Sequence, residues 1–173
     1  MKTLVIYYSR SGNTRMVARR IADALGGEIE ELTDQVDRKG IVGYLRSGRE
    51  AFLGRRAKLN PIAADLSSFD LVVIGTPVWN ASLSSPIRTF LQDHAAALPR
   101  VAFFCTLGGR GRDRVLRQME QICGKAPLAT LGVTEKMLNH EELTVAVDSF
   151  ASRLSPPVET RRPYAREPAP LHA

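Results

Sequence analysis

Hydroxyl-bearing and small residues follow the first apolar run of the chain, in the order Ser9, Arg10, Ser11, Gly12, Asn13 and Thr14. A helix is predicted to begin at Thr14, so the segment combines hydroxyls, successive backbone N–H groups and the partial positive charge of a helix start. Together these groups suit a phosphate dianion. Arg10 or Arg15 could add charge, although neither is required. An ordinary helix cap with nothing bound uses the same residue types, so both interpretations stay open.

Two further segments carry residues that suit a flat ligand. The first, 75–81, holds Pro77, Val78, Trp79 and Asn80 and contains the only tryptophan of the chain. A rigid proline followed by an aromatic ring offers a wall for a planar group, while burial of Trp79 in the core is the alternative. The second, 106–111, contains three glycines. It either lets backbone N–H groups approach a ligand closely or forms a flexible turn.

Other phosphate chemistries are excluded by residues that are missing. The sequence has no G-x-x-x-x-G-K-[ST] motif and no G-x-G-x-x-G motif after the first apolar run, which excludes a P-loop NTPase and the dinucleotide fingerprint. A phosphatase built on the first segment would need a cysteine nucleophile between Tyr7 and Thr14, where none stands. A phospho-acceptor receiver would need a carboxylate after the second buried strand, where Thr76 and Pro77 stand instead.

Alternating patterns of apolar residues predict the elements that position these segments. Strands are expected over residues 2–8, 28–32, 70–76, 101–106 and 127–133, because these runs are apolar or alternating. Helical spacing is expected from Thr14 to the Gly26-Gly27 pair, in a basic stretch marked by Ile41, Leu45 and Phe52, and over 87–91, 115–122 and 143–154.

Five strands alternating with helices predict an α/β fold, a doubly wound, three-layer parallel sheet. Ligands of such sheets bind outside the carboxyl ends of the strands, where the strand order reverses. The three segments described above follow the first, third and fourth expected strands. We therefore expect them to meet at one edge of the sheet.

Composition bounds the rest of the molecule. The 173 residues fit one domain, expected over 1–154, and five of the ten prolines fall in the tail 155–173, which predicts disorder there. No apolar run approaches the ~20 residues of a membrane helix, so the default expectation is a cytoplasmic protein. Cys105 and Cys123 are expected to be core residues, and the three histidines are too scattered to suggest a metal site.

The net charge of +6 is concentrated in the segment 38–58. A second basic cluster, Arg110 to Arg117, is interrupted by Asp113 and followed by Glu120. Neither cluster alternates with stacking aromatics, which argues against nucleic-acid binding. A solvated basic face and a docking patch for an anionic partner both stay open.

The segment YSRSGNT resembles the [ST]-x-[ST]-G-x-T phosphate loop of the flavodoxin family, and GTPVWNASLSSPIRTFL resembles the second flavin loop of that family. With KGIVGYLRSGREAF and VAFFCTLGG, the chain is similar to a broad bacterial group of flavodoxin-like proteins. The resemblance extends from residue 2 to about residue 154. It implies strand order 2-1-3-4-5 and non-covalently bound FMN.

The resemblance also implies roles for individual residues. Ser9, Ser11, Gly12, Asn13 and Thr14 would hold the phosphate, with Arg10 contributing its backbone or charge. Pro77, Val78, Trp79 and Asn80 would contact the isoalloxazine and the ribityl chain, and the pyrimidine side would be lined by Thr106, Leu107, Gly108, Gly109 and Arg110. Backbone donors there can stabilise negative charge at N1 of the reduced ring. No catalytic side chain is expected, because N5 of the flavin carries the chemistry.

Two departures from carrier flavodoxins shape the expected function. Leu107 and two glycines stand where many carriers have a tyrosine over the ring, and the pI of about 9.7 contrasts with the acidic carriers. We therefore expect an FMN-dependent oxidoreductase that takes electrons from NAD(P)H and passes them to a quinone-like acceptor. The alternatives are an electron carrier for a protein partner and a flavin-free interaction module using 38–58. The resemblance also leaves a homodimer open.

Overall fold

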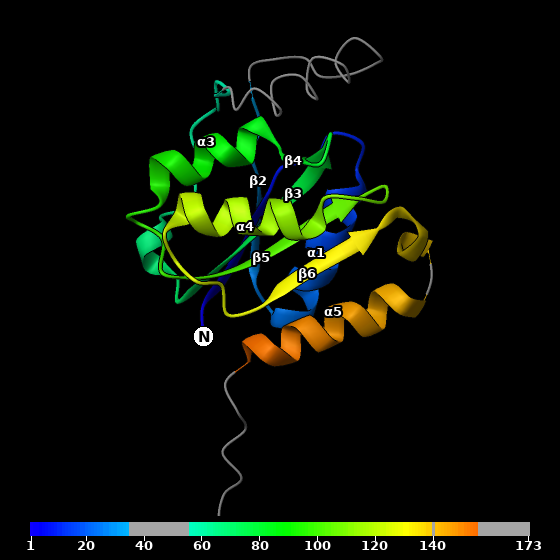
Figure 1. Cartoon of the computed structure of the whole chain (residues 1–173). Helices are drawn as coiled ribbons and strands as arrows, with labels where there is room; N and C mark the ends of the chain where they lie inside the picture. The colour runs from blue at the N-terminus through cyan, green and yellow to red at the C-terminus, as the bar shows by residue number, and fades with distance from the viewer. Residues whose placement is uncertain (35–55, 140, 156–173) are drawn as a thin grey trace, which may run out of the picture.

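The computed structural model describes residues 1–34, 56–139 and 141–155. Five strands form a parallel sheet in the order β2-β1-β3-β5-β6. They are β1 (Thr3–Tyr7), β2 (Glu28–Glu31), β3 (Leu71–Trp79), β5 (Arg100–Leu107) and β6 (Thr130–Thr134). Counted along the chain, these strands have the 2-1-3-4-5 order that was expected, so the predicted fold class is confirmed (Figure 1).

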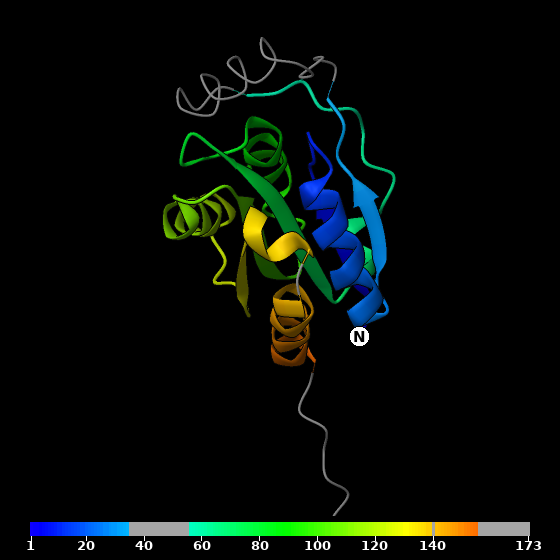
Figure 2. The same cartoon turned by 90° about the vertical axis from the view of Figure 1, so that its right-hand side faces the viewer.

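Helices cover both faces of this sheet (Figure 2). One face carries α1 (Asn13–Leu25) and α5 (Glu141–Leu154), and the other carries α3 (Ser85–His94) and α4 (Arg112–Cys123). Two short 3-10 helices, η1 (Leu66–Ser68) and η2 (Glu135–Asn139), precede β3 and follow β6. The end of α1 lies at Gly26, whose φ of +59° is the left-handed cap that the Gly-Gly pair predicts.

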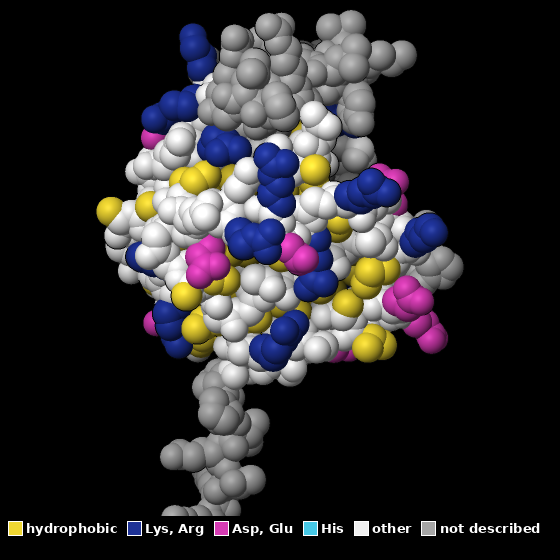
Figure 3. All heavy atoms as spheres, viewed as in Figure 1, with side chains coloured by type: hydrophobic (Ala, Val, Ile, Leu, Met, Phe, Trp, Pro, Cys, Tyr) yellow, Lys and Arg dark blue, Asp and Glu magenta, His cyan; other side chains and the backbone are white. Residues whose placement is uncertain are grey.

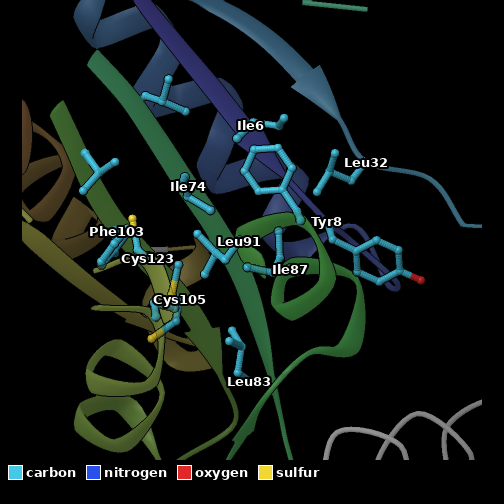
Figure 4. Packing of buried hydrophobic residues seen from close by; sticks show 14 of the residues in the cluster. Ile6, Tyr8, Leu32, Ile74, Leu83, Ile87, Leu91, Phe103, Cys105 and Cys123 are labelled. Carbon is cyan, nitrogen blue, oxygen red and sulfur yellow. The ribbon is translucent and has the colours of Figure 1, made fainter. Parts of the chain in front are cut away.

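Alternate residues of the strands build two separate cores. Ile6, Ile74 and Phe103 are in register across β1, β3 and β5 and pack against Ile87 and Leu91 of α3 (Figure 4). Their neighbours in sequence point to the other face, toward α1 and α5. Since both faces are covered, these strands are apolar at nearly every position, whereas the edge strand β2 (EIEE) is not.

A short hairpin that the residue pattern did not predict lies at the end of β3. The strand continues to Trp79, beyond the predicted end at Thr76, and pairs antiparallel with β4 (Ser82–Leu83). The two residues of the turn, Asn80 and Ala81, have φ values of +48° and +53°. Positive φ at both central residues defines the type I′ turn that joins tightly paired antiparallel strands. Alanine is an unusual residue there, and for that reason the pattern did not predict a turn.

Some expectations fall outside the described residues. The basic helical stretch around Ile41, Leu45 and Phe52 lies there, as does the tail from residue 156 onward. The domain boundary at residue 154 therefore stays a prediction. No helix among the described ranges is long and apolar enough to cross a membrane.

Candidate functional site

A cavity of about 310 Å³ opens at the carboxyl ends of the parallel strands. This volume lies at the lower end of the range of about 300–1,000 Å³ that is usual for cofactor and ligand pockets. Ten of the fifteen predicted site residues line it, together with Glu135. The lining residues are Arg10, Ser11, Asn13, Thr14, Pro77, Val78, Trp79, Thr106, Leu107, Gly108 and Glu135.

The loop after β1 is shaped from within by Ser9. The backbone N–H groups of Gly12 and Arg15 donate to Ser9 Oγ at 3.1 and 3.3 Å. Gly12 precedes the first residue of α1 with φ of +97°, a conformation that side chains rarely adopt. Neither Ser9 nor Gly12 lines the cavity. Their hydrogen bonds instead fix the path of the loop that carries Ser11 and Asn13.

The remaining amides of this loop are available to a ligand. Within the described ranges, the backbone N–H groups of Ser11, Asn13 and Thr14 have no hydrogen-bond acceptor. The first N–H groups of any helix lack partners in their own helix and carry partial positive charge. Since all three residues line the cavity, this end of it is suited to an anion.

A buried pair of hydroxyls connects the first loop to the end of β5. Thr14 Oγ1 lies 2.8 Å from Thr106 Oγ1, and both residues are buried. One hydroxyl donates to the other, so one of their two hydrogens stays available for a further acceptor. The pair fixes the start of α1 against the third predicted loop, and both residues line the cavity.

Trp79 is buried, as one interpretation of its sequence position expected, and it also lines the cavity, so its predicted role as a wall for a planar ligand stays a prediction. It belongs to the core packed under α3 and α4, with an exposed fraction of 6%. Its ring meets that of Tyr8 edge to face, with centroids 5.6 Å apart and planes at 90°. This arrangement fixes the orientation of the indole. Asn80, by contrast, is an exposed residue of the hairpin turn and does not line the cavity.

The loop after β5 contributes backbone more than side chains. Leu107 ends β5 with its side chain buried in the core, and it lines the cavity together with Thr106 and Gly108. Gly109 and Arg110 are exposed and do not line it. The next residue, Gly111, has φ of +101°, and a Cβ there would lie 2.7 Å from Cα of Ala81. The loop between β5 and α4 is therefore in direct contact with the hairpin turn that follows Trp79.

The two arginines of the first loop have different surroundings. The guanidinium of Arg15 donates to both carboxylate oxygens of Glu31, at 2.9 and 2.8 Å. These hydrogen bonds raise the pKa of Arg15 above its ordinary value. The hydroxyl of Tyr7 also donates to Glu31 at 3.2 Å. Because Arg15 is engaged at the β2 edge, Arg10 is the arginine that lines the cavity.

Glu135 is the cavity residue that the sequence analysis did not find. It is exposed and begins η2, directly after β6. Its Oε2 atom would lie 3.9 Å from a Cβ placed on Gly108, so it stands beside the third loop. A signal was present, because Glu135 follows the carboxyl end of a parallel strand, as the other three segments do.

The two cysteines are buried in the core under α3 and α4, as predicted (Figure 4). Burial raises the pKa of the Cys105 thiol to about 12, so it stays protonated at neutral pH. The pKa of Cys123 is also raised, mainly by burial. In the parts of the chain that are described, no group of three His, Cys, Asp or Glu residues could hold a metal ion.

Residues 1–142 match the model of a protein family described as NADPH-dependent FMN reductase. The chain belongs to this family. The expected resemblance to flavodoxin-like flavoproteins is thereby confirmed, and the family match covers every residue of the cavity.

Solved structures support the same fold. A flavoprotein from Lactobacillus acidophilus NCFM, in complex with FMN, is 26% identical, with a TM-score of 0.64 over 76% of this chain and 92% of that one. A Bacteroides uniformis protein is 21% identical, with a TM-score of 0.72 over 87% and 97%. The two-electron reduced flavodoxin of Megasphaera elsdenii is 20% identical, with a TM-score of 0.57 over 87% and 98%. No curated protein is significantly similar to the sequence.

Proposed function

We propose that the chain binds FMN in the cavity, with the phosphate on the loop of residues 9–14, and acts as an oxidoreductase. The observation that carries this proposal is that Ser11, Asn13 and Thr14 line the cavity and that their backbone amides have no acceptor in the described chain. The family description and the FMN complex of the Lactobacillus flavoprotein support FMN as the ligand.

The residues present fit this cofactor by type. The amides of the first loop, the free hydrogen of the Thr14 and Thr106 pair and the charge of Arg10 suit a phosphate. Pro77, Val78 and Trp79 form an apolar wall suited to a flat ring. Among the residues predicted for the site, Ser9, Gly12 and Asn80 act by shaping loops, and Gly109 and Arg110 lie at the margin.

The chemistry itself belongs to the cofactor, since bound FMN accepts electrons at N5 and passes them on. The chain positions the cofactor and leaves access to it. In the described part of the third loop, no aromatic side chain stands over the cavity, because Leu107 is buried and glycines follow. This opening supports NAD(P)H as the donor and a quinone-like molecule as the acceptor. A cytoplasmic location is part of the same proposal.

Binding is tested by titrating the purified chain with FMN and with riboflavin, which lacks the phosphate. Hydrogen bonds to a charged group contribute about 1.5–3 kcal/mol each, so FMN is expected to bind at least about a hundredfold more tightly. The quenching of flavin fluorescence measures both dissociation constants. Equal affinity for the two flavins would overturn the phosphate site.

Turnover is tested separately, by following oxidation of NADPH or NADH by the FMN-loaded protein with a panel of quinones. We expect turnover well above that of free FMN at the same concentration. Turnover no faster than free FMN would overturn the enzyme assignment and leave the electron carrier, while the FMN site would stand on its own measurement.

A further inference from the structure

The layer formed by α3 and α4 carries an excess of positive charge. Five arginines belong to these helices or to the loop before α4, against three carboxylates, Asp93, Asp113 and Glu120. We call the arginines the α3–α4 basic surface: Arg88, Arg110, Arg112, Arg114 and Arg117. In Figure 3, the face that bears α3 and α4 shows more basic than acidic side chains.

Much of the opposing charge on these helices is already engaged. Asp93 pairs with Arg56, which is outside the basic surface, whereas Asp113 lies 3.9 Å from Arg112, which belongs to it. The opposite layer differs, because α1 and α5 together carry four arginines and four carboxylates. One of those arginines, Arg15, is paired with Glu31. The charge excess of the described helices is therefore confined to one side of the sheet.

Arg88 is the most unusual member of the surface. Its side chain is partly buried, and its Nε atom is fully buried without a hydrogen-bond partner in the described ranges. Burial lowers the pKa of this guanidinium from its ordinary value. Burying a charge is unfavourable unless an opposite charge or a hydrogen bond compensates for it. Since Nε itself is inaccessible, an anionic group from outside the chain would compensate the charge through the exposed part of this side chain.

The basic surface reaches the rim of the cavity. Arg110 is two residues beyond Gly108, which lines the cavity, and α4 begins at Arg112 immediately afterward. Gly111 packs against Ala81 of the hairpin that also carries Trp79. A molecule bound along α4 would therefore lie beside the cavity opening.

We propose that the α3–α4 basic surface docks an acidic electron-transfer protein next to the cavity. Complementary charge accelerates encounter and orients the two proteins, and the Arg88 guanidinium gives the acidic partner a partly buried anchor. The redox role of the partner rests on the proposed function, whereas the docking does not, because the arginines act without any cofactor.

The test measures binding of a soluble acidic [2Fe–2S] ferredoxin to the full chain, with and without FMN, by biolayer interferometry. Raising the ionic strength from about 20 to about 300 mM should weaken binding at least about tenfold, because surface charges are then screened. The double variant Arg114→Glu with Arg117→Glu should weaken binding by a similar factor at low salt. Basic cytochrome c should bind the double variant better than the wild type.

A matched double variant on the opposite layer is Arg19→Glu with Arg20→Glu, both on exposed positions of α1. It changes the net charge equally and should alter ferredoxin binding less than about twofold, since binding depends on local charge. Circular dichroism verifies that both variants fold. An equal loss in the two variants would overturn the proposal, because a nonspecific effect of net charge would then explain the binding.

A second outcome would also overturn it. Tighter binding of a short single-stranded RNA than of ferredoxin at the same ionic strength, lost in the α4 variant, would assign the surface to nucleic acid. Failure of the chain to retain FMN would affect the proposed function only, because ferredoxin binding is measured with the cofactor-free chain as well.

Discussion

The two edges of the sheet differ in how their backbone amides are paired. At the amino edge, the N–H groups of Asp70 and Leu71 donate to the carbonyl of Lys2 at 2.8 and 3.3 Å. The N–H of Lys2 donates in turn to the Asp70 carboxylate at 2.6 Å. At the carboxyl edge, the amides of Ser11, Asn13 and Thr14 have no acceptor within the described chain. These backbone amides of the amino edge are paired within the protein, whereas those of the carboxyl edge are suited to pairing with a ligand.

The largest expected loss of stability comes from a substitution at Gly75, in the central strand β3. A Cβ at this position would lie 2.0 Å from the ring of Phe104, which is fully buried. Overpacking a core costs typically about 1–3 kcal/mol, and we expect Gly75→Ala to lose about 3 kcal/mol of unfolding free energy in urea denaturation.

Gly132→Ala in β6 is the matched control. Its Cβ would meet Arg112 Cδ at 2.6 Å, but the Arg112 side chain is exposed and can move. A loss below about 1 kcal/mol is expected there, since surface changes are mild. Equal losses of unfolding free energy in the two variants would show that the core around Gly75 is no more rigid than the surface around Gly132.

A smaller effect is expected from the buried threonines at the two edges. Thr14→Val leaves Thr106 without its partner, which costs about 1–3 kcal/mol of unfolding free energy. Thr3, at the start of β1, has a buried hydroxyl with no hydrogen-bond partner in the described residues. Thr3→Val should therefore be neutral or stabilising in the same denaturation experiment. Destabilisation by both substitutions would show that the two hydroxyls do not differ in how they contribute to stability.

The glycines at the two ends of α1 allow the two edges of the sheet to be compared by their effect on ligand binding. Gly12 and Gly26 both have positive φ, and a Cβ on either would meet no atom of the described residues within 4 Å. Alanine is strained at both positions, and each substitution should lower the unfolding free energy by about 1 kcal/mol. Only Gly12→Ala should raise the dissociation constant for FMN, by about tenfold, because it displaces the amides beside it. A comparable rise in Gly26→Ala would contradict the proposed phosphate site.

The smallest effect at neutral pH concerns Cys105, near the carboxyl end of β5. Its pKa is raised by burial from 9.0 to about 12, so the unfolded chain releases this proton at lower pH than the folded one. The stabilising contribution is present below pH 9.0 and is lost as the pH rises toward about 12. Thermal unfolding from pH 7 to 11 should show a smaller alkaline loss in Cys105→Ala than in the wild type. Identical slopes would show that Cys105 is not the group responsible.

Much of the fold followed from the sequence because burial on both faces leaves a clear signal. Continuous apolar runs predicted the central strands, and the Gly26-Gly27 pair predicted the end of α1. The hairpin after Trp79 was missed because Ala81 adopts a φ of +53°, for which alanine has no preference. In the fold, Ala81 lies against Gly111, a contact that residue types alone do not reveal.

The candidate site was predictable in its position more than in its details. The rule that ligands bind at the carboxyl ends of parallel strands was enough to predict ten residues that line the cavity. The separate tasks of Ser9 and Ser11 could not be read from sequence, because they depend on which way each group points in the folded loop. Glu135 was missed because the end of the fifth expected strand, residues 127–133, was not considered.

The hydrogen bonds that Ser9 accepts have a consequence for the speed of cofactor uptake. Because Gly12 and Arg15 are tied to Ser9 by bonds internal to the chain, the loop has little conformational freedom left to lose. Uptake should then proceed in one phase, at a rate set by encounter, with no lag for loop ordering. A chain that has shed its flavin would thus remain a ready receptor, able to reload without refolding.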